Sequence, residues 1–212
     1  PYTTLFRSGV IYVGCGSGVY SVDMDTKELN LLSTVNGLSD VNVTSVGYSD
    51  QASALIIAYA NGNLDILKDG EVINLRDILI ASSINQKRVN HITIRGTMAY
   101  LACDFGIATV DLVKEEIPSY VIFLDGNGLE MEVYDVEFTN NGQMLAAADE
   151  GLYYYDGNGA LQDFGAWQVY DEIFQGTYNS VVNHNGTIYA CYSRKLSNGF
   201  DNQDTIYTFN GS

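Results

Sequence analysis

The feature that most constrains the fold is a glycine that recurs at a nearly constant interval, each time between two short apolar stretches. The four copies are Gly18, Gly62, Gly106 and Gly151, so successive glycines are 44, 44 and 45 residues apart. A repeat of about 40–45 residues with several strands inside it is typical of a β-propeller, in which each repeat forms one blade. The spacing therefore predicts an all-β chain built from repeated sheets.

One complete repeat is readable in residues 36–67. Strands are expected near residues 43–46, at Ala54–Tyr59 and at residues 64–66, because these stretches are short and apolar. The dipeptide Asn61-Gly62 forms the turn before the last strand, since both residues tolerate a positive φ. A single sheet of this kind cannot bury both of its faces, so it needs neighbouring copies.

The repeats predict one β-propeller domain over residues 1–212, with about five four-stranded blades of 44–45 residues. Their expected bounds are residues 2–35, 41–76, 89–124, 132–165 and 178–212. Propellers close a ring of roughly four to eight blades, and the fifth repeat here shows no outer strand. We therefore expect part of a larger, seven-bladed ring. The alternative is a small ring that the first residues of the chain complete.

Three segments fall outside the simple repeat. Residues 77–86 are apolar and short, and we expect one helical turn or a loop there. The outer strand of the fourth blade is expected in residues 161–164, and an insertion at residues 192–204 interrupts the fifth blade.

The charge of the chain limits its partners. The formal net charge is −16, and residues 115–193 contain 13 Asp or Glu and no Lys or Arg. Nucleic acids and anionic membrane surfaces are bound through cationic side chains, so neither is an expected partner. The acidic surface has a simple role in solubility, and cation binding is the alternative. No transmembrane run or signal peptide is recognisable, and we expect no direct insertion into a membrane.

Two acidic loops are candidate ligand contacts. Asp125 and Asn127 lie in an Asp-Gly-Asn-Gly run that is faintly similar to a calcium-binding loop, and residues 201–204 are similar in composition. Neither loop has the regularly spaced oxygens and closing Glu that calcium needs. The simpler interpretation of both is a solvated hairpin turn, and no metal is assigned.

Aromatic side chains supply the other candidate contacts. Trp167 and Tyr154 have faces on which a sugar ring or a partner side chain can stack. Strand alternation places Tyr153 and Tyr155 on one face and Tyr154 on the other. Because packing between blades requires large side chains on both faces, core packing is the simpler role for all of them.

Cysteine and histidine point to no catalytic site. Successive cysteines among Cys15, Cys103 and Cys191 are 88 residues apart, which equals two repeats. We therefore expect them at equivalent positions in blades one, three and five, too far from one another for a disulfide. We interpret them as small buried packing residues. His91 and His184 have no evident third partner for zinc. No nucleophile, phosphate-binding or metalloprotease motif occurs, so we expect a protein that is not an enzyme and has no cofactor.

Several phrases resemble a known family. Three segments are similar to the N-terminal propeller of PorZ, a surface component of the type IX secretion system of Bacteroidetes. They are the run from Asn36 to Leu67, the sequence Val-Ile-Asn-Leu-Arg-Asp-Ile that begins at Val72, and residues 89–117. The resemblance covers roughly residues 10–167. Gly-Leu-Ser-Asp at residues 37–40 is also shared by propellers in periplasmic sensor regions of hybrid two-component regulators. Those usually have a Trp-Ile-Gly-Thr-like strand, where this chain has Leu-Ile-Ile-Ala-Tyr, which favours the PorZ-like interpretation.

The resemblance implies a role outside the inner membrane, at the cell surface, at the outer membrane or in the periplasm. Members of the PorZ family have two propellers and a C-terminal β-domain. They work with secretion-system partners that process secreted cargo and attach it to anionic lipopolysaccharide. The resemblance carries no catalytic residues over to this chain, so it implies a non-enzymatic interaction module, with a glycan or lipopolysaccharide as a further ligand to consider. The alternative is a ligand-sensing, glycan-binding propeller of a hybrid two-component regulator.

Overall fold

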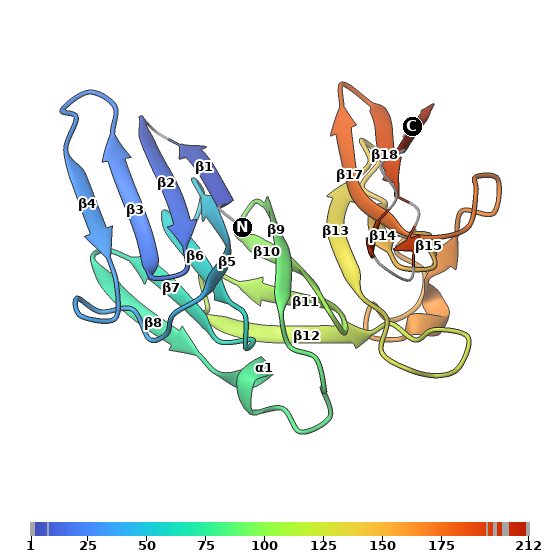
Figure 1. Cartoon of the computed structure of the whole chain (residues 1–212), viewed down its shortest axis with the longest axis horizontal. Coiled ribbons are helices and arrows are strands. Elements are labelled where there is room, and N and C mark those ends of the chain that lie inside the picture. Colours follow the sequence, from blue (N-terminus) through green and yellow to red (C-terminus); the bar gives the residue numbers. More distant parts are fainter. Residues whose placement is uncertain (1–2, 8, 194, 197–198, 201–203, 211–212) are drawn as a thin grey trace. The chain divides into compact units, whose positions relative to one another are not determined.

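In the computed structural model, almost all of the regular elements are short strands (Figure 1). It describes residues 3–7, 9–193, 195–196, 199–200 and 204–210. The chain divides into two compact units, the first made of residues 1–100 and 109–118 and the second of residues 101–108 and 119–212. The boundary between these units runs through the third sheet.

Four sheets have four strands each, hydrogen-bonded in the order of the chain. The first contains β1 (Thr3–Arg7), β2 (Val10–Cys15), β3 (Gly18–Asp23) and β4 (Leu29–Leu32). The second contains β5 (Val43–Ser49), β6 (Ala54–Tyr59), β7 (Leu64–Lys68) and β8 (Glu71–Leu75). The third contains β9 (Val89–Arg95), β10 (Met98–Cys103), β11 (Gly106–Asp111) and β12 (Glu116–Ile122). The fourth contains β13 (Val133–Phe138), β14 (Met144–Ala148), β15 (Gly151–Tyr155) and β16 (Gln168–Val169).

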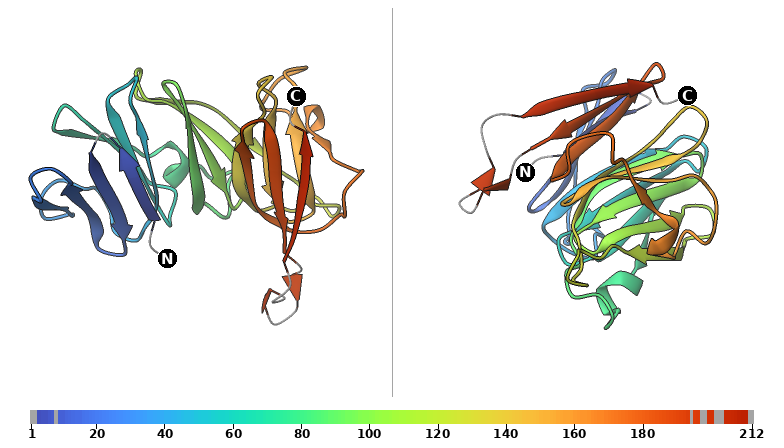
Figure 2. Two further views of the ribbon diagram at one scale, coloured as in Figure 1. Left: turned by 90° about the horizontal axis from the view of Figure 1, so that it is seen from above. Right: turned by 90° about the vertical axis from the view of Figure 1, so that its right-hand side faces the viewer.

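The fifth sheet has three strands in the described part of the chain. They are β17 (Tyr178–His184), β18 (Thr187–Tyr192) and β21 (Thr205–Asn210). The predicted insertion contains a small hairpin of β19 (Lys195–Leu196) and β20 (Gly199–Phe200), which projects beyond the end of this sheet (Figure 2). The predicted helical turn is present as α1 (Asp77–Ile80).

The first strands of successive sheets lie next to one another within each unit. In the first unit β1 contacts β5 and β5 contacts β9, and in the second unit β13 contacts β17. This neighbourhood of first strands is the arrangement expected for the inner strands of propeller blades. Middle strands are covered on both faces, so β6 and β14 are apolar throughout and completely buried. Outer strands such as β4 are mostly exposed.

Two clusters of buried side chains fill the space between neighbouring sheets. In the first unit Val43, Val46 and Ile57 of the second sheet pack with Val19 of the first. In the second unit Leu145, Ala147 and Leu152 of the fourth sheet pack with side chains of the fifth, namely Tyr178, Val181, Ile188 and Ala190. The hydrophobic core therefore lies between the sheets, as the need of each sheet for a neighbour predicted.

The recurring glycine has a clear physical reason at two of its four positions, Gly18 and Gly106. Gly18 and Gly106 begin the third strands β3 and β11 with φ angles of 154° and 136°. A Cβ atom would lie 2.1 Å from the Leu32 carbonyl oxygen at Gly18 and 2.2 Å from the Val121 carbonyl oxygen at Gly106. The backbone of the outer strand thus passes directly over the start of the third strand, and only glycine leaves room for it.

The predicted outer strand at residues 161–164 is wrong. The fourth strand of this sheet is β16, which pairs Gln168 with Tyr154 and Val169 with Tyr153. Residues Phe164–Ala166 form a 3₁₀ turn instead, and the Asp163 side chain caps it by accepting a hydrogen bond from the Gly165 N–H. This capped turn delays the strand because it directs aromatic side chains into the core before pairing begins.

The prediction that all three cysteines are buried is also only partly right. Cys103 is buried, whereas Cys15 and Cys191 are partly exposed, and all three are free thiols. Cys15 ends β2 beside an exposed turn, where its sulfur lies 3.5 Å from the Ser17 hydroxyl oxygen. This hydrogen bond lowers the pKa of Cys15, whereas burial raises the pKa of Cys103.

Candidate functional site

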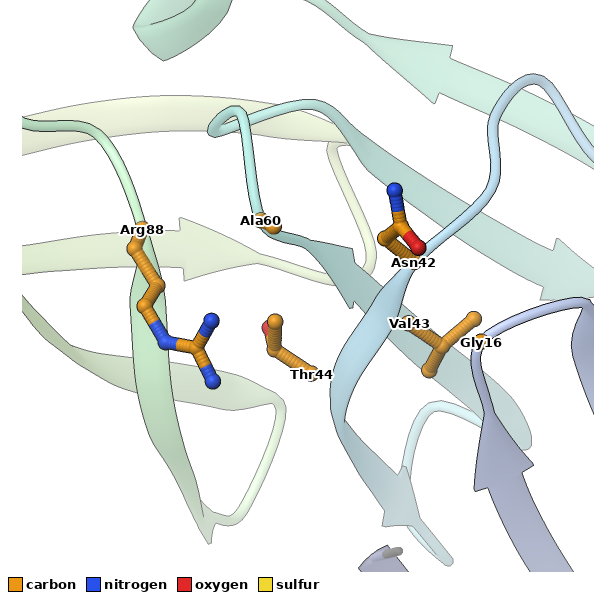
Figure 3. A pocket seen from close by; sticks show the side chains of 6 residues that line it. All are labelled: Gly16, Asn42, Val43, Thr44, Ala60 and Arg88. Carbon is orange, nitrogen blue, oxygen red and sulfur yellow. The ribbon is translucent and has the colours of Figure 1, made fainter. Parts of the chain in front are cut away.

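An open pocket of about 230 Å³ lies at one end of the sheets of the first unit (Figure 3). The β2–β3 turn contributes Gly16, the β6–β7 turn contributes Ala60, and the start of β5 contributes Asn42 to Thr44. Arg88, immediately before β9, completes the lining. The pocket therefore lies where two turns meet the beginnings of two inner strands.

Asn42 fixes the wall of this pocket through its backbone. Its φ angle is 61°, in the left-handed region that Asn adopts more readily than most residues. The Asn42 N–H donates to the Gly16 carbonyl oxygen at 2.8 Å, and the Ala60 N–H donates to the Asn42 carbonyl oxygen at 3.1 Å. One residue thus joins the turns of two neighbouring sheets, and its side-chain amide stays exposed.

Arg88 supplies the only charge among the residues that line the pocket. Its side chain is half-buried, and the guanidinium extends toward Thr44 (Figure 3). No hydrogen bond or ion pair engages this side chain within the described part of the chain. The neighbouring Lys87, by contrast, donates from Nζ to the Leu79 carbonyl oxygen at 2.7 Å.

The loop between the first two sheets is held by a buried carboxylate. Asp65 on β7 is 0% exposed. It accepts hydrogen bonds from the Ser39 N–H at 2.8 Å, the Tyr59 hydroxyl at 2.6 Å and the Asn74 side-chain amide at 2.9 Å. Burial raises the pKa of Tyr59, and its bond to Asp65 raises it further.

Asp40 anchors the same loop at a second point. Its carboxylate accepts hydrogen bonds from the side-chain amides of Asn61 at 2.7 Å and Asn63 at 3.4 Å. Burial by itself raises the pKa of Asp40, but the hydrogen bonds outweigh it and lower the pKa. The Gly-Leu-Ser-Asp phrase therefore has a structural role, which is to fasten the connection between two sheets beside the pocket.

Trp167, one of the sequence-predicted contacts, lies inside the second unit. It is 6% exposed, and its ring centroid lies 5.0 Å from that of Phe123 and 5.5 Å from that of Tyr155. Its Nε1–H donates to the Leu161 carbonyl oxygen at 3.3 Å. Its ring is therefore a packing group, with little free surface for a ligand.

Tyr154 lies on the opposite face of β15, as strand alternation predicted. Its ring centroid is 4.7 Å from that of Tyr170, and its hydroxyl donates to the Gln168 Oε1 at 2.9 Å. Tyr153 and Tyr155 instead face the Phe164 and Trp167 side. The structure thus separates Tyr154 from Trp167 and does not form one aromatic platform from them.

Asp125 and Asn127 form a hairpin turn. The Asp125 Oδ1 accepts hydrogen bonds from the N–H groups of Asn127 and Leu129, both at 2.8 Å. These bonds, with that from Leu129 the strongest, lower the pKa of Asp125. Nowhere in the described residues are three or more His, Cys, Asp or Glu side chains grouped to hold a metal ion.

The sequence patterns missed the residues of the pocket. Asn42, Thr44 and Arg88 belong to three segments that the repeat does not link. One sequence signal could have pointed to Arg88. Residues 72–103 contain four basic residues and only one acidic residue, in a chain of net charge −16. The basic residues are Arg76, Lys87, Arg88 and Arg95, and the acidic one is Asp77.

Comparison with protein families gives a match to the PorZ N-terminal β-propeller domain over residues 11–168. The chain belongs to this family. It is therefore an all-β propeller chain of the type found in PorZ, as its repeats predicted. A search of curated proteins gives no match.

Solved structures agree with the membership in the PorZ family. PorZ of Porphyromonas gingivalis, described as an essential bacterial surface component of the type IX secretion system, is 26% identical with a TM-score of 0.81, over 98% of this chain and 26% of that one. The extracellular domain of a putative one component system from B. thetaiotaomicron has a TM-score of 0.73 at 15% identity, over 96% of this chain and 26% of that one. The extracellular domain of a putative hybrid two component system from the same organism has a TM-score of 0.67 at 20% identity, over 88% of this chain and 26% of that one.

The PorZ-family chain spans about a quarter of the length of these solved relatives. Two of the relatives are extracellular domains and one is a surface component. In the described part of this chain, no helix has the length and apolar character needed to cross a bilayer.

Proposed function

We propose that this PorZ-family propeller is a non-enzymatic interaction module of a type IX secretion component, which assists the processing and surface attachment of secreted cargo. The family match over residues 11–168 is the observation that carries the proposal. The likeness to a surface component of this secretion system supports a place outside the cytoplasm, at the cell surface, at the outer membrane or in the periplasm. Its partners are then other secretion-system proteins, with a glycan or lipopolysaccharide as a further ligand.

The use of buried and partly buried carboxylates supports a non-enzymatic role. Asp65 holds a loop, as described above. Asp135 on β13 accepts a hydrogen bond from the Val181 N–H at 3.0 Å, and Glu137 accepts one from the Asn183 N–H at 3.2 Å. These side chains satisfy the backbone of the neighbouring inner strand, which is structural work rather than acid–base chemistry.

The domain itself is proposed to be a single, partial propeller over residues 1–212, with repeats near the predicted bounds and further blades completing a seven-bladed ring. Tyr154, Asp125 and Asn127 are proposed as partner contacts because they lie on loops or partly exposed positions of one unit. Trp167 is 6% exposed, so it offers a partner only a small part of its ring. Loops carried on rigid sheets are the usual place for such contacts.

Affinity purification of the tagged protein from its own cells tests the proposal. We expect secretion-system components among the co-purified proteins, and we expect deletion of the gene to leave secreted cargo unprocessed or unattached. Normal cargo processing in the deletion strain, together with no enrichment of secretion components, would contradict it.

A second candidate function is ligand sensing in a hybrid two-component regulator. The similarity to extracellular domains of such systems favours it, although at 15–20% identity that similarity reflects the fold. The coding sequence around this domain separates the two functions. A kinase or regulator segment would support sensing, and a secretion-type β-domain would support the first proposal.

A further inference from the structure

We propose that the Arg88 pocket receives a carboxylate from an acidic polypeptide partner. This deepens the proposed interaction module and rests on it. Arg88 offers a planar guanidinium whose paired N–H donors match the two oxygens of a carboxylate. Its side chain is half-buried and unengaged in the described part of the chain, so a ligand does not have to displace an existing ion pair.

The lining determines how such a carboxylate is held. The side chain of Asn42 is exposed at the pocket wall, and Figure 3 shows its amide nitrogen directed away from Arg88, so the guanidinium is the main donor to the carboxylate. The Thr44 hydroxyl donates to the Ala58 carbonyl oxygen at 3.3 Å, so it is left mainly as an acceptor that can help orient the guanidinium. Because Asn42 is tied to both neighbouring turns, this wall is fixed before a ligand arrives.

Size favours a side chain or chain end over a whole small molecule. The pocket volume is about 230 Å³. Small-molecule and cofactor sites usually occupy roughly 300–1,000 Å³. A Glu or Asp side chain, or a terminal carboxylate, fits a pocket of this size while the rest of the partner stays outside.

Charge favours an acidic partner at this place. The chain carries a net charge of −16, so most of its surface repels acidic segments. Lys87 and Arg88 lie next to each other at the pocket, in a stretch from residue 78 to residue 94 that contains no Asp or Glu. Attraction confined to one region gives an acidic partner orientation and specificity.

The test measures binding of a fluorescent Glu-rich peptide, with its Gln-substituted counterpart as the control ligand. Arg88→Ala should weaken binding of the Glu peptide several-fold, and Arg88→Lys should restore part of it. Arg76→Ala removes the same charge from the same segment outside the lining, so it should retain most of the affinity. Added salt should weaken the wild-type interaction.

Equal binding of the Glu and Gln peptides, or no effect of Arg88→Ala, would overturn this assignment. So would binding of inorganic phosphate or glucuronic acid at this site without binding of the Glu peptide. Co-purification of secretion components with the Arg88→Ala protein is measured in parallel. If these components still co-purify while the Arg88 assignment fails, the proposed function is retained and only the assignment of the Arg88 pocket is rejected.

A separate observation concerns chemical modification at Asn-Gly sequences. In such a pair the glycine backbone nitrogen can attack the Asn side-chain carbonyl carbon and expel ammonia, giving a cyclic imide. Water then opens the imide to aspartate or isoaspartate, which adds one negative charge. The reaction needs a glycine nitrogen that is free of hydrogen bonds and an Asn side chain that can rotate.

Most of the described Asn-Gly pairs fail this requirement because the glycine N–H is already a donor. Three of the glycines donate to backbone carbonyl oxygens: Gly62 to Tyr59, Gly128 to Asp125 and Gly142 to Thr139. Gly186 donates to the side-chain oxygen of Asn183. Two pairs have no such bond among the described residues, Asn36-Gly37 and Asn158-Gly159.

The side chains distinguish these two pairs. Asn36 is held by the Ser33 N–H at 2.5 Å, by the Ser33 hydroxyl and by the Leu31 carbonyl oxygen. Asn158 and Gly159 are exposed, and the Asn158 amide donates only to the exposed Asp156 at 2.8 Å. We infer that Asn158 is the preferred site of spontaneous deamidation in the described part of this protein.

Peptide mapping by mass spectrometry during incubation at mildly alkaline pH tests this inference. Asn158 should deamidate several-fold faster than Asn127, an equally exposed Asn-Gly site whose glycine N–H is bonded. Gly159→Ala should slow the reaction at Asn158 and leave Asn127 unchanged. Equal rates at both sites, or a faster rate at Asn127, would refute it.

Discussion

At the scale of single residues, the fold depends on a few buried polar groups whose loss is costly. Asp65→Ala removes the acceptor of the Ser39 N–H, the Tyr59 hydroxyl and the Asn74 amide. Buried donors left without a partner should lower the free energy of unfolding by about 3–5 kcal/mol, as measured by urea denaturation. The exposed Asp25→Ala is the control and should change it by less than about 0.5 kcal/mol. Similar losses in both variants would show that the Asp65 network does not hold the loop.

Buried tyrosines make the protein sensitive to alkali. Burial is the first cause that raises the pKa of Tyr59, Tyr134 and Tyr178 above the ordinary value of 10.0. Above about pH 10 the unfolded chain loses these protons while the folded protein keeps them, so the unfolded state binds fewer protons. The contribution of these tyrosines to stability should therefore be constant up to this pH and should be lost as the pH rises further.

Urea midpoints measured across this range check the expectation. Tyr59→Phe removes one of the hydroxyls whose pKa is raised, so the stability of this variant should decline less steeply above pH 10 than that of the wild type. A wild-type midpoint that stays flat well above pH 10 would contradict the burial of these hydroxyls.

At the scale of strands and sheets, the recurring glycine gives the sharpest prediction. Gly106→Ala places a methyl group 2.2 Å from the Val121 carbonyl oxygen at a φ of 136°. Strain and overpacking together should destabilise the protein by roughly 2–5 kcal/mol in urea denaturation. Gly126→Ala has open space around its new methyl group and should be nearly neutral. Full stability of Gly106→Ala would mean that β12 does not cross over the start of β11.

Much of this level was predictable from sequence. The glycine interval located the second and third strands of four sheets, because local backbone demands recur with the repeat. The outer strand at residues 161–164 was misplaced, since a turn capped by Asp163 and the burial of Trp167 override the apolar pattern there. The pocket was not predictable, because Gly16, Asn42 and Arg88 meet only after folding.

At the scale of the whole molecule, the proposed acidic partner follows from the net charge of −16 and from the basic residues Lys87 and Arg88 at the pocket. Membership of the PorZ family supports the proposed setting, in which the partners are components of the secretion system. The pocket depends on the sheets being propeller blades, because only then do turns and strand starts from successive repeats converge at one end. The function proposed here therefore depends on the propeller architecture.

A crystal structure of the protein is the most direct test of that architecture. We expect the five sheets to be arranged about a common axis, with the first strand of each sheet beside the first strand of the next. Sheets stacked face to face in two layers, or helices between the recurring glycines, would contradict it.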